Sequence, residues 1–175
     1  NFGAGAGALI LQRDAGRNLI LGSSAISDGS LSESVILTEA AAVGEAPELG
    51  DLRGRLDVTN PQYMADRLGE TSLANFQRVI TEAVERSGAS LSDVKFLGIT
   101  HMKHSFYQEI LQSVGLTAEQ GVYLEDYGHV QSADQVIALE LGLAQGKIRD
   151  GDLIVLAGAG TGYTWSAVAV RWGTA

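Results

Sequence analysis

Apolar residues recur with two different periods along this chain of 175 residues. In the first third, short apolar runs at 8–11, 19–21 and 35–37 are bounded by small or polar residues, a pattern typical of a meander of strands. Residues 55–59 (RLDVT) alternate apolar and polar positions, which predicts a strand that ends before Asn60 and Pro61. From Ser72 the apolar side chains follow a helical period as far as Val84, and Gly88 provides a stop.

The second half of the chain alternates strands with helices. The segments VKFLGIT (94–100) and GVYLE (121–125) predict strands, and between them we expect a helix over 105–114, since Ser105 and Gln108 have the spacing of a capping box. A later helix that ends at Gly146 places four apolar residues on one face: Val136, Ile137, Leu141 and Ala144. Strands at 152–157 and 163–172 flank a glycine-rich loop at 158–162. This order predicts an α/β fold with a mixed five-stranded sheet covered by helices.

Composition excludes several function classes. A formal net charge of -9 argues against binding of nucleic acid or an anionic membrane, because both require a basic surface. The absence of Cys excludes disulfides, thiolate metal sites and a cysteine nucleophile supplied by this chain. No apolar stretch approaches the roughly 18 residues that a membrane-spanning helix needs. The first residues, NFGAGAGALILQR, lack the basic start of a secretory signal, and we interpret them as a chain entered in the middle of a strand. Cytoplasm is the default compartment.

The three histidines stand where strands are predicted to end. His101 and His104 follow the strand that ends at Thr100, and His129 follows the strand that ends near Glu125. In open α/β sheets ligands bind at the carboxyl ends of strands, so these titratable residues are expected to converge on one edge of the sheet. The alternative is that each histidine is simply a polar residue at the start of a helix.

Two other kinds of site match parts of the sequence less well. His101 and His104 are spaced to share a helical face, with His129, Asp126 or Asp134 completing a metal-ligand set. The glutamate of the helical zinc-protease motif is missing between them, however, and no metal is predicted. The stretches GAGAG (3–7) and GAGTG (158–162) lack both the GxGxxG spacing and a P-loop lysine, which argues against nucleotide binding. Such glycines still allow backbone N–H groups to approach a ligand.

Four motifs follow one another from the start of the chain to its end. FGAGAGA stands at 2–8, GKIRDGD at 146–152, the glycine loop at 158–162, and the triplet YTW at 163–165 leads into a strand that closes in Arg-Trp. This order resembles that of ketosynthase III enzymes, which have the thiolase fold, with Ala4 where an aspartate is usual in the first motif. The resemblance covers nearly all 175 residues. It implies that 1–175 is the C-terminal half-domain of a thiolase-like fold, with 1–12 as the last strand of the N-terminal half.

The resemblance also implies roles for individual residues. The motif Pro-His-Gln-Ala-Asn becomes THMKH at 100–104, so His101 takes the place of the catalytic histidine and His104 that of the motif's asparagine. Gly-Asn-Thr-Ser-Ala becomes GHVQS at 128–132, which puts His129 in the place of the catalytic asparagine. Gly162 aligns with the glycine whose backbone N–H helps to form the oxyanion hole. Gly160 and His104 are expected to line the pocket.

Asp134 adds a third chemical group. It lies five residues after His129, and Gly-His-x-x-x-Ala-Asp is similar to a branch of the family that acylates oxygen or nitrogen with a Cys-His-Asp triad. A carboxylate that orients His101 would raise its basicity, which suits removal of a proton from an alcohol or amine and disfavours a nearby enolate. The alternative is an acid in the first turn of a helix, stabilised by the helix dipole. Since His129 keeps a possible donor, decarboxylative condensation stays open as the second chemistry.

The implied function is acyl transfer. An acyl group from a CoA or carrier-protein thioester would be held on a cysteine of the missing N-terminal half and passed to a carbon, oxygen or nitrogen nucleophile, without a cofactor. This chain alone would be inactive because it has no Cys. The expected partners are the N-terminal half, a second copy in a homodimer, and acyl-CoA or acyl carrier protein. The alternative is a catalytically silent, ketosynthase-like subunit that serves as a structural partner.

Overall fold

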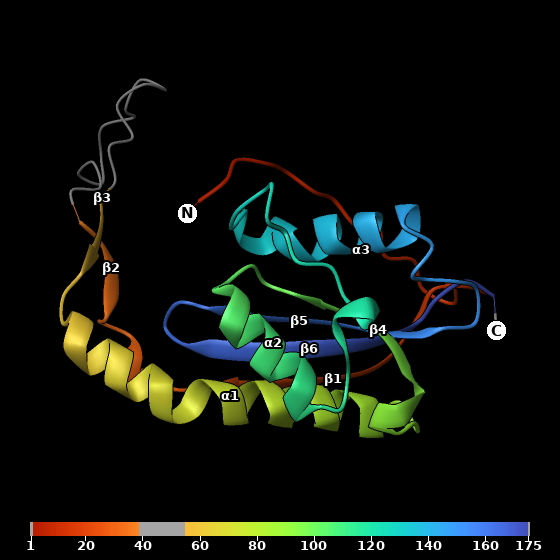
Figure 1. The fold of residues 1–175 in the computed structure, drawn as a ribbon, viewed down its shortest axis with the longest axis horizontal. Coiled ribbons are helices and arrows are strands. Elements are labelled where there is room, and N and C mark those ends of the chain that lie inside the picture. Colours follow the sequence, from red (N-terminus) through yellow and green to blue (C-terminus); the bar gives the residue numbers. More distant parts are fainter. Residues whose placement is uncertain (1, 39–54, 175) are drawn as a thin grey trace.

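A four-stranded mixed sheet forms the centre of the protein in a computed structural model that describes residues 2–38 and 55–174. Its strand order is β1 (Leu19–Ser27), β6 (Thr164–Arg171), β5 (Leu153–Gly160) and β4 (Val94–Ile99). The pair β4–β5 is parallel, and β5–β6 and β6–β1 are antiparallel. A separate antiparallel hairpin of β2 (Val35–Thr38) and β3 (Arg55–Val58) projects from one end of the molecule (Figure 1). The predicted α/β class and the mixed sheet are confirmed.

The predicted count of five strands is wrong for the main sheet of the described residues. The segment 121–125 forms a single parallel bridge, between Leu97 and Gly121. Its chain then turns, because the carbonyl of Leu124 accepts hydrogen bonds from the N–H groups of Tyr127 (3.2 Å) and Gly128 (3.0 Å). Residues 8–11 form no strand either, and the N-terminal segment pairs with the rest of the chain through one bridge between Phe2 and His129.

Helix α1 (Pro61–Arg86) packs across one face of the sheet and begins well before Ser72, where the helical period starts. Asn60 caps it, since its side-chain oxygen accepts a hydrogen bond from the N–H of Tyr63 at 3.1 Å, and Pro61 stands at the first helical position. The first turns extend past the sheet towards the hairpin (Figure 1), so they carry no continuous apolar stripe that would reveal them.

Helix α2 (His104–Ser113) lies beside α1 on the same face. The larger apolar core forms between these two helices and the sheet, and includes Phe76, Ile80, Tyr107, Ile110, Leu111 and Trp165. The predicted capping box of Ser105 and Gln108 is wrong, because α2 begins one residue earlier and its N-cap, Lys103, makes no side-chain capping bond. Short 3-10 helices cover Gly29–Leu31, Leu91–Asp93, Ala118–Gln120 and Gln131–Ala133. No described helix has the length and apolar character needed to cross a bilayer.

Helix α3 (Asp134–Ala144) covers β4 and β5 on the opposite face of the sheet (Figure 1). It buries Ala138, Leu139 and Gly142 rather than the face expected from the sequence. Its apolar residues are distributed all round, as in a helix with neighbours on two sides. The N-terminal segment provides one of these neighbours: a Cβ at Gly7 would lie 3.0 Å from Val136, so the lack of a side chain allows the segment to lie close against α3.

Candidate functional site

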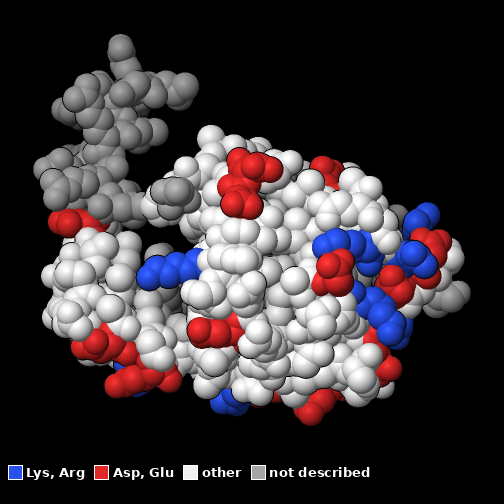
Figure 2. All heavy atoms as spheres, viewed as in Figure 1, with Lys and Arg blue, Asp and Glu red and all other residues white. Residues whose placement is uncertain are grey.

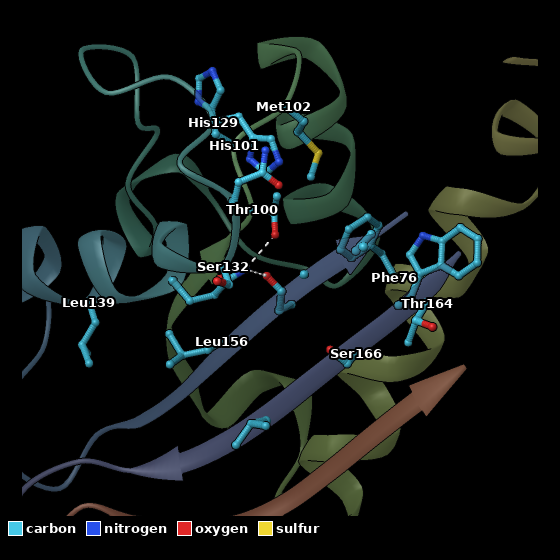
Figure 3. A pocket seen from close by; sticks show the side chains of 18 of the residues that line it. Phe76, Thr100, His101, Met102, His129, Ser132, Leu139, Leu156, Thr164 and Ser166 are labelled. Carbon is cyan, nitrogen blue, oxygen red and sulfur yellow. Dashed lines mark hydrogen bonds between the residues drawn. The ribbon is translucent and has the colours of Figure 1, made fainter. Parts of the chain in front are cut away.

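An open hollow of about 1490 Å³ lies at the carboxyl ends of β4 and β5 and continues along the face of β5, β6 and β1 that the described helices leave partly uncovered. His101 and His129 both line it, together with Gly160. The predicted convergence of these two histidines at one edge of the sheet is therefore present (Figure 3). No Asp, Glu, Lys or Arg of the described residues lines this hollow, so its polar chemistry depends on the histidines, amides and hydroxyls.

On the face shown in Figure 2, the charged groups of the described residues form no obvious binding surface for an anion. On the face shown in Figure 2, acidic and basic side chains of the described residues alternate without a continuous basic area. This arrangement agrees with the overall net charge of -9.

Asp134 is the most deeply buried charged residue of the site, with a fully inaccessible side chain. Its Oδ1 accepts a hydrogen bond from the backbone N–H of Val130 at 2.7 Å. Its Oδ2 is 2.7 Å from His129 Nδ1 and accepts a hydrogen bond from the backbone N–H of His101 at 2.8 Å. Three donors around one buried carboxyl group are the environment of an ionised carboxylate. Asp134 therefore joins the ends of two separate segments, 101 and 129–130.

The expectation that Asp134 orients the imidazole of His101 is wrong, since the carboxylate contacts only the backbone of that residue. The ring that it holds is that of His129. A carboxylate only accepts hydrogen bonds, so Nδ1 of His129 carries a proton and Nε2 is the nitrogen left free for chemistry. The side chain of His129 is 25% exposed and borders the hollow, so that nitrogen is accessible.

His101 is held in a different way. Its ring lies against that of Tyr123, with centroids 4.9 Å apart, and the Tyr123 hydroxyl donates a hydrogen bond to the carbonyl of Met102 at 2.8 Å. His101 Nδ1 is buried and has no hydrogen-bond partner among the described residues. Burial lowers the pKa of His101, although the nearby Asp134 acts in the opposite direction. The His101 ring is thus placed as a neutral group.

His104 does not line the hollow. It is exposed at the start of α2, and its ring packs against Tyr123 at 4.7 Å and stacks on Tyr107 at 6.4 Å. Burial raises the pKa of Tyr107 to about 12, so its hydroxyl stays protonated. His104 therefore does not have the expected position in the pocket. It packs in an aromatic cluster with Tyr107 and Tyr123, and Tyr123 in turn contacts the ring of His101.

The glycine-rich loop is shorter than the sequence suggests. Strand β5 continues to Gly160 and β6 begins at Thr164, which leaves only 161–163 between them. Gly160 and Thr161 line the hollow, whereas Gly162 lies just outside its lining. Gly162 has a φ of 129°, a conformation that side chains other than hydrogen rarely permit, which explains the glycine at this position.

A polar network beside the histidines has no clear signature in the sequence. The Gln135 side-chain nitrogen donates to Thr100 Oγ1 at 2.7 Å and to the carbonyl of Ala157 at 3.0 Å. It connects the start of α3 with the ends of β4 and β5. A Cβ at Gly158 would lie 2.6 Å from that nitrogen, so glycine is required for the network to form. The position of Gln135 next to Asp134 was its only signal in the sequence. Among the described residues no His, Asp and Glu side chains group as a metal-binding set.

Comparison with known proteins identifies the family. Residues 84–172, just over half of the chain, match the family model for the C terminal part of 3-oxoacyl-[acyl-carrier-protein (ACP)] synthase III. A beta-ketoacyl-[acyl-carrier-protein] synthase III of Microcystis aeruginosa is 29% identical over 174 residues, which cover 98% of this chain and 52% of that protein. One from Symbiobacterium thermophilum is 36% identical over 101 residues, or 55% of this chain and 31% of that protein. The chain spans about half the length of the first of these relatives.

Solved structures agree on the fold. A 3-oxoacyl-[acyl-carrier-protein] synthase III from Aquifex aeolicus matches with a TM-score of 0.70 and 22% identity, over 92% of this chain and 46% of that one. The acyltransferase ChlB3 matches with a TM-score of 0.63 and 19% identity, over 89% of this chain and 46% of that one. From the family match and this shared architecture, the chain belongs to the 3-oxoacyl-[acyl-carrier-protein] synthase III family and corresponds to the C-terminal half of its thiolase-like fold.

Proposed function

We propose that this chain supplies the general base and the sheet frame of an acyltransferase, which passes an acyl group from a thioester to an oxygen or nitrogen nucleophile. One observation carries the proposal: the fully buried carboxylate of Asp134 lies 2.7 Å from His129 Nδ1. A carboxylate in this place fixes the tautomer of the ring and stabilises the imidazolium that forms when Nε2 takes a proton.

The identity of the free nitrogen favours transfer over condensation. In neutral His129, Nδ1 holds the proton and Nε2 presents a lone pair, so the ring accepts a proton rather than donating a hydrogen bond. Decarboxylative condensation, which the resemblance leaves as the second chemistry, needs donors that stabilise an enolate. The negative charge of Asp134 beside such an enolate would oppose its formation. Removal of a proton from an alcohol or amine suits the same pair of residues.

The reaction has two balanced halves. First, a cysteine thiolate of the N-terminal half attacks the acyl carbon of a CoA or carrier-protein thioester; a new C–S bond forms, the C–S bond to the donor breaks, and the donor leaves as a thiolate. In the second half, the hydroxyl or amine of the acceptor attacks that carbon while its proton passes to His129 Nε2. A C–O or C–N bond forms, the C–S bond to the enzyme breaks, and the proton passes from His129 to the cysteine sulfur.

The remaining site residues take supporting roles in this proposal. His101 is proposed as a neutral hydrogen-bond donor to the reacting thioester, a role supported by its burial and lowered pKa. The backbone N–H of Gly162 is proposed to stabilise the tetrahedral oxyanion, as implied by the family motif. No cofactor is needed, since the thioester itself supplies the activated acyl group.

The partners follow from the same proposal. The apolar face of β6 and β1 is suited to be covered by an N-terminal half that also carries the cysteine, because the chain spans only about half the length of its relatives. A homodimer of the complete protein and a cytoplasmic location are further proposals that agree with the family. Size-exclusion mass of the complete protein tests the dimer.

The proposal is tested by combining the chain with the N-terminal half and an acyl-CoA, then searching for an acylated cysteine by mass spectrometry. We expect an adduct of the acyl mass and its disappearance when an amine acceptor is added. Absence of the adduct overturns the enzymatic function and leaves the silent structural subunit as the better description.

Asp134→Asn separates the two chemistries within this test. The amide keeps the size of the side chain but removes the charge, so we expect the second half-reaction to slow by about 10²–10⁴-fold while the cysteine still acylates. If acyl transfer is untouched by Asp134→Asn, the proposed base is wrong.

A further inference from the structure

The segment GVYLE (121–125) sends alternate side chains to opposite sides. Val122 and Leu124 are buried in the smaller apolar core, together with residues of β4, β5 and α3. Tyr123, which stands between them, packs instead against the larger core on the side of α2. The alternation persists although the segment pairs with β4 through a single bridge. It places a tyrosine ring beside the carboxyl end of β4, against His101.

Tyr123 is fixed by several contacts within the chain. Its hydroxyl donates a hydrogen bond to the carbonyl of Met102 at 2.8 Å. Its ring lies against the ring of Tyr107, with centroids 5.4 Å apart, and against that of His104, with centroids 4.7 Å apart. Tyr107 is 3% exposed, so this side of Tyr123 rests on a residue of the core. All of these partners belong to this chain, so the position of Tyr123 does not depend on what covers the open face of the sheet.

The imidazole of His101 has no comparable polar partner. Asp134 reaches only the backbone N–H of this residue, and the ring Nδ1 is buried without a hydrogen-bond partner among the described residues. A buried N–H without an acceptor is costly, so the proton of the neutral ring belongs on Nε2. The orientation of the ring therefore depends on packing. The aromatic ring packed against it is that of Tyr123, with centroids 4.9 Å apart and an interplanar angle of 34°.

Tyr123 and Asp134 hold the same short segment from two directions. The carboxylate accepts a hydrogen bond from the N–H of His101 at 2.8 Å, and the Tyr123 hydroxyl donates to the carbonyl of Met102, also at 2.8 Å. Of the two, Tyr123 alone also contacts the ring. Burial is the main cause that lowers the pKa of His101, while the charge of Asp134 raises it and that of His129 lowers it. The ring of Tyr123 contributes to this burial.

We infer that Tyr123 is a positioning residue, which holds the His101 ring in the orientation that directs its Nε2–H to the reacting thioester. Tyr123 does not line the hollow, so it acts through His101 rather than on the substrate. The inference rests on the proposed function, because it serves the donor role assigned there to His101.

Two substitutions of Tyr123 separate the ring from its hydroxyl. In the complete protein, with ¹⁵N-labelled histidine, NMR reports the tautomer and the pKa of each imidazole. We expect Tyr123→Leu to raise the pKa of His101, because water reaches the ring while Asp134 stays in place. Acylation of the cysteine by an acyl-CoA should slow about 10-fold, since the donor is misplaced but not removed. Tyr123→Phe keeps the ring and loses one hydrogen bond, so the pKa of His101 should stay and acylation should slow about threefold.

Tyr127→Leu is the matched control, because Tyr127 is an exposed tyrosine of the same loop that does not line the hollow. It should leave both the pKa of His101 and the rate of acylation unchanged. The signal of His129 distinguishes positioning from general damage, since a disturbed structure would change the titration of both rings. The positioning role is wrong if Tyr123→Leu leaves the pKa of His101 unchanged, or if the pKa of His129 moves by the same amount. If the wild-type cysteine is not acylated while Tyr123→Leu moves His101 alone, the proposed function is overturned and the support of the ring by Tyr123 stands.

Discussion

His129 and His101 lie at the same end of the sheet and contact the same aspartate, yet their environments differ. Asp134 reaches the imidazole of His129 but only the backbone of His101. His129 therefore has a charged partner on its ring, whereas the ring of His101 rests against Tyr123 and has a buried Nδ1 without a partner among the described residues. Since Asp134 holds the proton of His129 on Nδ1, the Nε2 atom of that ring is free to accept a proton. Burial lowers the pKa of His101, so the second ring is suited to remain neutral.

The comparison shows that one carboxylate gives two histidines different functions by its choice of contact atom. By accepting the N–H of His101 it fixes the backbone from which that ring projects. By accepting Nδ1–H of His129 it fixes both the position and the tautomer of the other ring. Loss of the carboxylate should therefore affect His129 through chemistry and His101 through position.

His129→Asn provides the largest test of this difference, because it removes the ring that Asp134 activates. An amide cannot accept a proton at neutral pH, so we expect transfer to an amine or alcohol to fall about 10²–10⁴-fold. Acylation of the cysteine of the complete protein should persist, since it does not require this base. The rates of the two half-reactions are measured by rapid-quench mass spectrometry of the cysteine peptide. Equal losses in both half-reactions would show that His129 has no role specific to the acceptor.

The sequence was informative about where the histidines lie and uninformative about their partners. Histidines that follow Thr100 and Gly128 had to lie near the hollow, because strand ends meet at one edge of the sheet. Which ring faces Asp134 depends on the path of 128–133, where Gln131 adopts a φ of 55° and is the first residue of a 3-10 turn. No residue at that position announces the turn, since glutamine has no preference for a positive φ.

The fold shows the same limit. Helix α1 was recognised only from Ser72, because its first turns have no apolar stripe, although Asn60 and Pro61 form a good helix start. The prediction of a fifth strand at 121–125 is wrong because the backbone turns at Leu124, and this turn competes with strand pairing. Apolar period predicts which segments are buried, as Val122 and Leu124 are, but it does not determine whether their backbones pair.

The second-largest expected effect is a loss of stability in Asp134→Ala. It leaves the backbone N–H groups of His101 and Val130 without their acceptor in a buried place, and we expect a cost of about 3 kcal/mol in the free energy of unfolding. Urea denaturation of the complete protein measures it. Asp126→Ala is the matched control, because Asp126 is exposed in the same loop. Its replacement should change the free energy of unfolding by no more than about 0.5 kcal/mol. A similar small effect for Asp134→Ala would mean that the carboxylate does not hold the two segments together.

The smallest effect is a change in the titration of His101, and it tests the neutral ring directly. Burial holds its pKa below the ordinary value of 6.5, while Asp134 raises it in part, so Asp134→Asn should lower the pKa of His101 further. NMR of histidine-labelled protein can follow each ring, because the chain has only three histidines. As pH falls below 6.5 the unfolded chain takes up a proton at His101 before the folded chain does, so stability decreases until the folded pKa is passed. A folded pKa at or above 6.5 would contradict the division between the two rings. It would mean that the charge of Asp134 outweighs burial at His101. His101 would then be suited to accept a proton rather than to remain a neutral donor.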